Sequence, residues 1–446
     1  MTLVMPTRIL VVGGGGREHA LAWKLAGEPG VNEVIVAPGS AAMAHEPRVR
    51  TLPGVDALDP AAVVAAARAV AAELVVVGPE APLAAGVADA LREAGFAVFG
   101  PSREAARLES SKAFCHAVAE AAGVGMARAR SFGGGEDEAA AGFIRELDAA
   151  GAGVVLKADG LAAGKGVIVT DSVTQALELA PSFLAGRRAG EPALVVEECL
   201  AGREASVIAI CDGTRAVALP AARDHKRLCD GDRGPNTGGM GAYSPLPDLD
   251  DAVVERIIET VHVPILVEMA RRGSPFRGFL YAGLMLTSDG PVLLECNVRL
   301  GDPEAQVILP RVAVALGPLL GAAAAGRLPS DLAPCLPAVP GAAVGIVLAA
   351  EGYPGTPRRG NPIDGLDAAA AAGGLVFHAG TIERPQGGYG TNGGRVLTVV
   401  GRGATLLLAR EQAERAADAI TWDGMQRRRD IATDVPQPAV AIGAGR

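Results

Sequence analysis

Lysines, glycines and an aspartate lie close together between residues 154 and 169, in the sequence VVLKADGLAAGKGVIV. Lys157 and Asp159 end a short apolar run, and Lys165 lies in a glycine-rich segment that leads into a second β-branched run. β-Branched residues favour extended backbone and glycine permits tight turns, so we predict a strand, a glycine loop and a second strand. Loop N–H groups and nearby lysines could bind phosphates. A flexible hairpin with surface lysines is the alternative.

This segment differs from the P-loop of other nucleotide-binding proteins. The spacing from Gly160 to Gly164 is one residue too short, and Gly166 stands where that motif requires Ser or Thr. No helical pattern follows the loop directly. Any phosphate site here must therefore be built on paired strands.

A second polar cluster lies at residues 293–306, in the sequence LLECNVRLGDPEAQ. Alternation along a strand places Glu295 and Asn297 on one face, beside Arg299. A carboxylate and an amide oxygen suit Mg²⁺ when a triphosphate supplies the remaining oxygen ligands. The alternative, an edge strand with solvated polar residues, fits poorly because the neighbouring residues are apolar.

The composition restricts the class of protein. The 446 residues suggest two to four domains, and aromatic residues make up only 3%, so cores must be aliphatic. A net charge of −9 without a basic tract argues against nucleic acid as a partner. Six scattered cysteines without a CxxC pair favour free thiols in a reducing cytoplasm. We expect no signal peptide, because the start becomes a glycine turn too soon, and no membrane span.

Residues 7–100 alternate between apolar strands and helices. Continuous apolar strands separated by helices predict a doubly wound parallel sheet that binds ligands at the carboxyl ends of its strands. We expect strands at 9–12, 33–37, 74–78 and 97–100, and helices from Arg17, at 60–72 and at 82–94.

The first of these strands ends in a glycine turn, Gly13–Gly16, before a helix. A nicotinamide site is not expected, because Glu18 takes the third position of the glycine fingerprint and no acid ends the second strand. The turn could instead bind one phosphate at the helix N-terminus, with Arg17 nearby. His19 is open between a substrate contact and helix packing.

Four polar residues between 110 and 205 each allow two interpretations. Lys112, after a serine cap, either faces a nucleotide or is an ordinary solvated helix charge, which the isolated pattern favours. Glu197, Glu198 and Glu204 lie among apolar residues of two strands in 193–210. They either accept hydrogen bonds from a nucleoside or are solvated acids at a sheet edge.

The remaining chain predicts a central unit and a smaller C-terminal α+β unit. We expect a long polar loop at 222–245, ordered by its aromatic and apolar end, and a frayed tail over the last sixteen residues. Expected helices span 101–125, 136–150, 172–185, 250–272, 311–326 and 404–420, and further strands 279–286, 345–350, 375–380 and 395–401.

Taken in order, ten segments resemble the phosphoribosylamine–glycine ligase family of the ATP-grasp superfamily, over about residues 7–430. The segments are GGGGREHALAW, VAPGS, VGPEAPL, SKAF, KADGLAAGKGVIV, DHKR, GPNTGGMGAYSP, GFLYAGLM, ECNVRLGDPEAQ and TNGGRVL. The resemblance implies ligation of glycine to 5-phosphoribosylamine, giving glycinamide ribonucleotide, ADP and phosphate in the second step of purine synthesis. It also implies ATP and Mg²⁺ (or Mn²⁺) as cofactors.

The resemblance further assigns site residues. It implies catalytic roles for Lys157, Lys165 and Arg299, and Glu295 and Asn297 as metal ligands. ATP would contact Lys112, Lys157, Gly164, Lys165, Gly166, Glu197, Glu198, Leu200 and Glu204. The other substrates would contact Gly15, Gly16, Arg17, Glu18, Asp224, Lys226, Arg299, Gly394 and Arg395. The 5-phosphate would bind at Gly13–Gly16 and Arg17, with Gly393–Arg395 as the alternative.

The implied architecture is α/β. An N-terminal doubly wound domain would span 1–108, a two-lobed ATP-grasp domain 109–328 with a mobile lid at about 126–194, and a C-terminal α+β domain 329–430, followed by a tail at 431–446. We expect a cytoplasmic monomer with small-molecule substrates; transient contacts with other enzymes of purine synthesis stay open. Many superfamily relatives have a metal-binding acid where this chain has Gly283-Leu284-Met285, so a second tightly held ion is less expected.

An amine does not displace oxygen from a carboxylate, so the implied route phosphorylates glycine first and closes the lid over glycyl phosphate. The sequence identifies no general base. Two other functions remain open: another ATP-grasp carboxylate–amine ligase, and a nucleotide-binding regulatory protein without catalysis.

Overall fold

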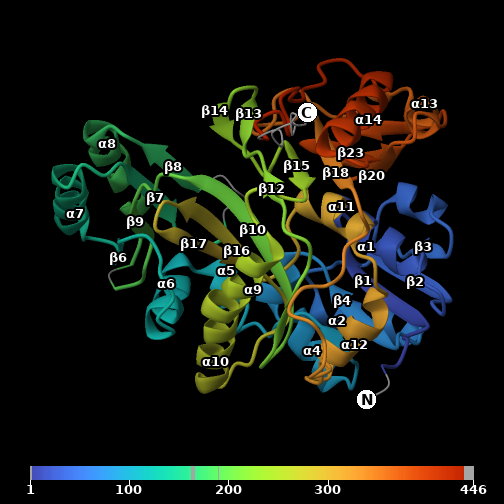
Figure 1. Ribbon diagram of the computed structural model, residues 1–446, viewed down its shortest axis with the longest axis horizontal. Coiled ribbons are helices and arrows are strands. Elements are labelled where there is room, and N and C mark those ends of the chain that lie inside the picture. Colours follow the sequence, from blue (N-terminus) through green and yellow to red (C-terminus); the bar gives the residue numbers. More distant parts are fainter. Residues whose placement is uncertain (1–2, 162–165, 189, 436–446) are drawn as a thin grey trace, which may run out of the picture.

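The computed structural model describes residues 3–161, 166–188 and 190–435. An N-terminal parallel sheet, a small antiparallel lobe, a larger antiparallel sheet and a C-terminal unit follow one another along the chain (Figure 1). The described ranges include no helix with the length and apolar character needed to cross a bilayer.

The N-terminal sheet confirms the doubly wound prediction. Its five strands are parallel, in the order β3-β2-β1-β4-β5. The strands are β1 (Arg8–Gly13), β2 (Glu33–Pro38), β3 (Val49–Thr51), β4 (Leu74–Val77) and β5 (Val98–Phe99), and the helices are α1 (Gly16–Ala26), α2 (Pro60–Ala69), α3 (Glu80–Ala85) and α4 (Val87–Glu93). The single helix expected at 82–94 is divided, because Gly86 adopts a left-handed conformation with φ of 89°.

The small lobe is formed by residues 129–198 and contains the predicted strand, loop and strand. Strand β7 (Val154–Ala158) pairs antiparallel with β8 (Val167–Thr170), which confirms the hairpin. The sheet order is β6-β9-β7-β8, with β6 (Ala129–Phe132), β9 (Leu194–Glu198) and the helices α7 (Asp137–Ala149) and α8 (Val173–Leu184). Gly164 and Lys165 lie outside the described residues.

The large sheet has the order β11-β10-β16-β17 and is antiparallel. Its strands are β10 (Arg203–Asp212), β11 (Ala216–Ala218), β16 (Arg277–Thr287) and β17 (Gly290–Asn297). The helix expected at 250–272 is α9 (Asp251–Ile257) and α10 (Val263–Arg271), joined by a π-helical turn at Ile258–His262. The short helix α5 (Arg107–Ser110) and α6 (Lys112–Ala121) replace the one helix expected at 101–125.

The prediction of a loop at 222–245 is wrong. These residues form β12 (Arg223–Asp224), the hairpin of β13 (Arg227–Cys229) and β14 (Arg233–Asn236), and β15 (Gly241–Ser244). Strand β15 pairs with β18 of the C-terminal unit, so this unit includes strands from the middle of the chain (Figure 1). Because the partner strand is about a hundred residues away in the sequence, the local pattern of apolar and polar residues does not reveal this pairing.

The C-terminal sheet has the order β12-β15-β18-β23-β20. Its later elements are β18 (Ala342–Ala349), β20 (Leu375–His378), β23 (Arg395–Gly403), α13 (Leu366–Ala371) and α14 (Leu406–Ala419), and a small sheet adds β19 (Pro362–Ile363), β21 (Thr381–Glu383) and β22 (Tyr389–Thr391). The tail prediction is wrong at its start, because Ile431 is fully buried; residues 436–446 lie outside the described chain.

The helix expected at 311–326 is shorter than predicted. A 3₁₀ turn covers Leu309–Arg311, after α11 (Glu304–Ile308), and α12 begins only at Leu316 and ends at Ala324. The carboxylate of Glu28 accepts hydrogen bonds from the N–H groups of Leu316 and Gly317, at 2.6 and 2.9 Å. A side chain from the N-terminal domain therefore fixes where α12 begins.

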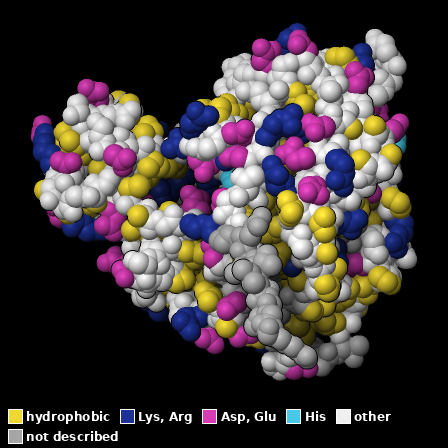
Figure 2. Space-filling model, turned by 45° about the horizontal axis from the view of Figure 1, so that its top comes forward, with side chains coloured by type: hydrophobic (Ala, Val, Ile, Leu, Met, Phe, Trp, Pro, Cys, Tyr) yellow, Lys and Arg dark blue, Asp and Glu magenta, His cyan; other side chains and the backbone are white. Residues whose placement is uncertain are grey.

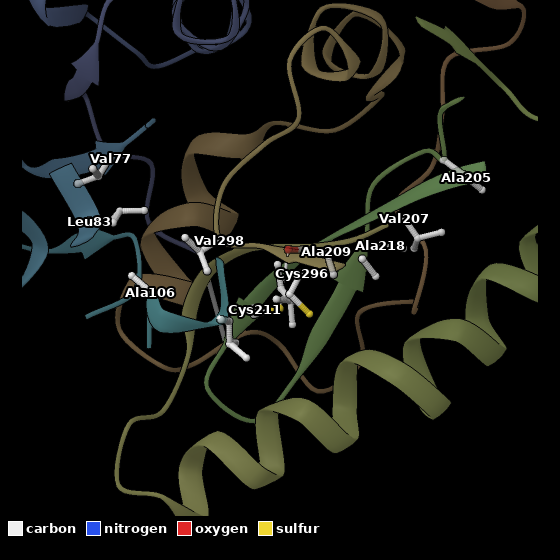
Figure 3. Close-up of a cluster of buried hydrophobic side chains, with 14 of the residues drawn as sticks. Val77, Leu83, Ala106, Ala205, Val207, Ala209, Cys211, Ala218, Cys296 and Val298 are labelled. Atoms are coloured by element: carbon white, nitrogen blue, oxygen red, sulfur yellow. Dashed lines mark hydrogen bonds between the residues drawn. The ribbon is translucent and has the colours of Figure 1, made fainter. Parts of the chain in front are cut away.

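Buried side chains join three of the four units. One large cluster extends from Val77 and Leu83 of the N-terminal domain, past Val298, which follows β17, to Val207 of β10 on its other side (Figure 3). The small lobe has a cluster of its own around α7, α8 and its sheet. The large sheet is thus held by its neighbours, whereas the small lobe has a separate core.

Candidate functional site

A cavity of about 730 Å³ lies between the small lobe and the large sheet. Figure 2 shows the hollow beside the small lobe, with basic and acidic side chains along its edges. Strands β7, β8 and β9 line it from one side and β10, β16 and β17 from the other. Arg17 and Arg395 reach it from the N-terminal and C-terminal units.

The cavity brings together most of the residues that the sequence singled out. Lining residues from that set are Arg17, Lys112, Lys157, Gly166, Glu197, Glu198, Leu200, Glu204, Asp224, Lys226, Glu295, Asn297, Arg299 and Arg395. The cavity lining does not include Gly15, Gly16, Glu18 or Gly394. Gly394 instead lies against the ring of Tyr353.

Lys157 connects the two walls of the cavity. Its ammonium lies 2.8 Å from the carboxylate of Glu197 on β9 and donates to the carbonyl of Leu294 on β17 at 3.0 Å. Glu197 is also 2.8 Å from His116 of α6. Burial opposes the charge of Glu197, but the His116 hydrogen bond and Lys157 hold the pKa of that carboxyl below its usual value. The solvated-acid reading of Glu197 is wrong, since only 2% of it is exposed.

Lys112 reaches the base of the glycine loop, so it is not an ordinary solvated helix charge. Its ammonium donates to the carbonyl of Gly160 at 2.5 Å. The carboxylate of Asp159 accepts from the Ser111 hydroxyl at 3.1 Å and from the Ala113 N–H at 3.1 Å. Asp159 therefore ties the loop to the N-terminus of α6, which holds Lys112 at the cavity wall.

Glu295 and Asn297 lie on one face of β17, as the alternation predicted. Asn297 Nδ2 is 3.3 Å from Glu295 Oε1, while Cys296 and Val298 point into the core. Burial alone would raise the pKa of Glu295, but Lys226 and Lys157 outweigh it and lower the pKa. Two adjacent oxygen donors fit a Mg²⁺ ion that takes its other ligands from phosphates and water. Within the described ranges, no group of three or more acidic, histidine or cysteine side chains could hold an ion alone.

Arg299 is fixed by two carboxylates that the sequence did not single out. It donates to Glu109 at 2.7 Å and to Glu80 at 3.2 Å. Burial works against the charge, but both partners keep the pKa of Arg299 above its ordinary value. Glu109 also accepts from the N–H of Val298 at 2.8 Å. The arginine is thus positioned by α5 and α3 as well as by its own segment.

The glycine turn before α1 is closed by its own chain. Glu18 accepts from the N–H of Gly15 at 2.8 Å and from Arg17 Nε at 2.6 Å. This capping occupies an N–H group that we expected to be available to a phosphate. His19 is a packing residue, because Nδ1 accepts from the N–H of His378 at 2.9 Å and the ring meets Phe377 edge-on.

At the far end of the cavity, charged side chains face one another. Glu204 pairs with Lys226, and Arg395 lies 3.2 Å from the carboxylate of Asp302. Burial opposes the charge of Lys226, but Glu204 and Asp224 raise its pKa well above the ordinary value. The cavity lining also includes apolar side chains, namely Met126, Val155, Val169, Leu200 and Leu294. The cavity therefore has a slot suited to a flat base and a charged end suited to ionic substrates.

The sequence pattern did not predict Glu80, Glu109 or His116 as site residues, and it indicated no role for Asp159. Three of the four act on a residue that was predicted, and Asp159 holds the helix on which Lys112 lies. Their signal in the sequence is weak, because single acids and histidines on helices are usually solvated or structural. Only the tertiary pairing reveals them.

Comparisons with known proteins agree on one family. Three family models match in order: phosphoribosylglycinamide synthetase N domain at residues 7–109, its ATP-grasp (A) domain at 110–305 and its C domain at 343–434. A phosphoribosylamine–glycine ligase of Streptomyces coelicolor is 51% identical over 95% of this chain and 98% of its own. One of Neisseria meningitidis is 46% identical over the same shares.

Solved structures give the same result for the fold. The crystal structure of a phosphoribosylamine–glycine ligase from Thermotoga maritima matches 95% of this chain and 100% of its own, with a TM-score of 0.77 and 35% identity. The biotin carboxylase domain of a Hydrogenobacter thermophilus 2-oxoglutarate carboxylase, bound to MgADP, matches with a TM-score of 0.70 at 16% identity. The second likeness concerns the fold alone and, with the family models, confirms the predicted ATP-grasp architecture.

Proposed function

The chain belongs to the phosphoribosylglycinamide synthetase family, and we propose from this premise how its cavity joins glycine to 5-phosphoribosylamine. The reaction consumes ATP and yields glycinamide ribonucleotide, ADP and phosphate. One observation supports the assignment of roles most directly: Lys112 and Lys157 face Glu295, Asn297 and Arg299 across a single cavity. This arrangement places positive charge and oxygen donors around one triphosphate-sized space.

ATP would lie with its base in the apolar slot and its phosphates toward β17. Lys157 and Lys112 would bind phosphate oxygens, with Glu197 holding Lys157 in place until the nucleotide arrives. Gly164, Lys165 and Gly166 would cover the phosphates, and the backbone of Glu198–Leu200 would contact the base. Glu204 would contact the ribose after exchanging its partner Lys226 for a hydroxyl.

Glu295 and Asn297 would hold Mg²⁺ (or Mn²⁺), which when bound neutralises charge between the β- and γ-phosphates. The pair fits this role because β17 presents two oxygen donors on one face and Lys226 and Lys157 keep Glu295 anionic. Arg299 would stabilise the γ-phosphoryl group as it moves to the carboxylate of glycine. Its two carboxylate partners prevent it from swinging away.

The reaction must activate glycine, because an amine does not displace oxygen from a carboxylate ion. Phosphorylation gives glycyl phosphate, whose phosphate is a good leaving group. Water would destroy this intermediate, so we propose that the lid expected at about 126–194, which includes most of the small lobe, closes over it. Such closure would have to rearrange the contacts that join the lobe to the rest of the molecule, which include Lys157 with the Leu294 carbonyl, Asp159 with the N-terminus of α6, and Glu197 with His116.

The phosphoribosyl group would bind at the charged end of the cavity. Arg17 and Arg395 line that end and come from the N-terminal and C-terminal units. Because Glu18 already caps the glycine turn, the 5-phosphate would have to displace this carboxylate or bind nearer Arg395. We propose that the enzyme works as a cytoplasmic monomer, in keeping with its free cysteines among the described residues.

Isotope transfer tests the proposed function. Glycine labelled with ¹⁸O in its carboxylate should give inorganic phosphate with one label and unlabelled ADP. The second measurement is ADP release with a panel of amines and amino acids, which should be largest for glycine with 5-phosphoribosylamine. Label in AMP, or pyrophosphate as a product, would refute glycyl phosphate; a different preferred pair would indicate another carboxylate–amine ligase.

A further inference from the structure

The end of the short strand β12 presents a carboxylate that forms none of the ion pairs seen elsewhere in the cavity. Asp224 lines the cavity and is half-buried. Across the described ranges no side chain donates a hydrogen bond to it, whereas the ammonium of its neighbour Lys226 pairs with Glu204. An uncommitted carboxylate at the substrate end of a cavity is available for chemistry.

The other acids near it are occupied. Glu304, at the start of α11, accepts from the hydroxyl of Ser206 at 3.1 Å, and Ser206 in turn contacts the Tyr281 hydroxyl at 2.8 Å. Glu204 pairs with Lys226, and Glu295 belongs to the proposed metal pair. Asp224 therefore differs from its neighbours in having no fixed partner.

Burial and the neighbouring carboxylates favour the protonated form of Asp224. Burial has the largest effect and raises the pKa of Asp224, whereas the positive charge of Lys226 lowers it. The carboxylates of Glu304, Glu204 and Glu295 raise it further, and the resulting pKa is about 8. Tyr281 of β16 also faces this group. In the same cavity the pKa of Glu295 is lowered, so the two carboxylates are set for different tasks.

We propose that Asp224 is the general base that takes the proton from the amino group of phosphoribosylamine as this group attacks glycyl phosphate. The inference rests on the proposed function. The nitrogen forms a bond to the carbonyl carbon, and the bond from that carbon to the phosphate oxygen breaks, so phosphate leaves with the electron pair. The proton passes from nitrogen to the Asp224 carboxylate and then to solvent. Without this transfer the positively charged nitrogen would be expelled again in preference to phosphate.

Hydroxylamine separates activation of glycine from proton transfer, because it attacks acyl phosphates readily without a base. We would assay full-length Asp224→Asn with Mg-ATP and glycine in two reactions, one with hydroxylamine and one with phosphoribosylamine. Formation of glycine hydroxamate should persist and should fall far less than formation of glycinamide ribonucleotide, which also shows that the variant is folded. Formation of glycinamide ribonucleotide should fall by about 10²–10⁴-fold, the usual contribution of a general base.

The pH profile gives an independent readout. For wild type, kcat/KM for phosphoribosylamine should rise with pH with a midpoint near pH 8. Asp224→Asn should lose this rise, and Asp224→Glu should restore part of it. Asp289→Asn, a matched loss of charge at an exposed turn after β16, should behave as wild type. Loss of hydroxamate with a raised KM for glycine would refute the proposal and make Asp224 a glycine contact.

Two further outcomes would also refute it. Near-wild-type synthesis of glycinamide ribonucleotide by Asp224→Asn, with an unchanged pH profile, would show that no base is needed at this position. If wild type itself forms no hydroxamate from glycine, glycyl phosphate is not made; the proposed function then fails first, and the role of Asp224 with it.

Discussion

The two sheets that enclose the cavity are built differently. Strand β10 of the large sheet is buried continuously from Ala205 to Asp212, and this sheet packs into the two large clusters of the molecule. Strand β8 at the edge of the small lobe is partly exposed, with 41% of Val169 accessible. The small lobe has its own core, and among the described residues its connections to the large sheet include Lys157 and the Met126–Leu293 bridge.

This difference indicates a division of labour. The groups that we propose act on the transferred phosphoryl lie on or just after strand β17 of the large sheet; they are Glu295, Asn297 and Arg299. Lys157, which we propose binds the nucleotide phosphates, lies instead on the small lobe, which has a core of its own. Rigid positioning favours electrostatic catalysis, whereas a separately folded lobe can open to admit substrates.

The largest expected effect on turnover comes from a substitution in the large sheet. Glu295→Gln keeps the shape of the side chain but removes its charge, so we expect kcat to fall by two to three orders of magnitude, about 2.7–4 kcal/mol. The fold should survive, because Glu295 faces the cavity and its backbone pairing with Gly283 does not depend on charge. Steady-state kinetics across Mg²⁺ concentrations, with circular dichroism, would measure both.

The control for this variant lies on the same hairpin. Asp289→Asn removes one negative charge at the exposed turn between β16 and β17 and should leave kcat within about twofold, since surface substitutions are usually near-neutral. Near-normal turnover of Glu295→Gln at low Mg²⁺ would show that the metal is held elsewhere.

The second effect concerns acid stability. Burial lowers the pKa of His262, in the π-helical turn over the large sheet, to about 4, against nearby carbonyls that raise it. The unfolded chain has the ordinary value of about 6.5, so it takes up a proton first as pH falls. Stability is therefore complete above pH 6.5 and decreases toward pH 4, by at most about 3 kcal/mol. Residues 126–198 contain none of the six histidines, so the small lobe lacks this contribution.

Denaturant unfolding at pH 7 and pH 4.5, followed by tryptophan fluorescence, would measure this effect. Trp23 and Trp422 both lie outside the small lobe, so the signal reports the rest of the molecule. His262→Leu should remove about 2–3 kcal/mol of the difference between the two pH values. His45→Leu is the control, because 72% of the His45 side chain is exposed. An equal pH dependence in wild type and His262→Leu would contradict the assignment.

Sequence reasoning succeeded where one local pattern determined the answer. Alternation in LLECNVRL placed Glu295 and Asn297 on one face, and the β-branched runs around Gly160 predicted the hairpin of β7 and β8. The doubly wound sheet followed from continuous apolar strands. In each case the decisive interactions are between residues close in sequence, or are uniform along a strand.

Sequence reasoning failed where the hydrogen-bond partner of a residue or strand could not be identified from the local pattern. The polar run at 222–245 has turn-forming residues, but β15 completes the ladder of β18, about a hundred residues later. The sequence predicts that the glycine turn and Arg17 are available to a phosphate, but the carboxylate of Glu18 accepts hydrogen bonds from both the Gly15 N–H and Arg17. The partners of Arg299, Glu80 and Glu109, come from the N-terminal domain and from α5, which no spacing in the motif indicates.

The smallest effect, and the most direct test of the comparison, is a change in hydrogen exchange. Strand β8 lies at the edge of the small lobe and pairs with β7 in the hairpin, and Leu161 and Val169 of this region are exposed. Amides there should exchange quickly without nucleotide, because few apolar contacts oppose opening. A non-hydrolysable ATP analogue with Mg²⁺ should slow this exchange by at least about tenfold, or 1.4 kcal/mol, since phosphates would bridge the lobe to β17.

AMP serves as the matched control ligand, because it fills the base slot without the β- and γ-phosphates that Lys112 and Lys157 would bind. It should protect the hairpin much less than the ATP analogue does. Amides of β10 and β16, buried in the large sheet, should exchange slowly with or without either ligand and thus give an internal reference. Equal protection of the hairpin with and without the ATP analogue would show that the hairpin is rigid. The proposed contrast between a fixed large sheet and a mobile small lobe would then be wrong.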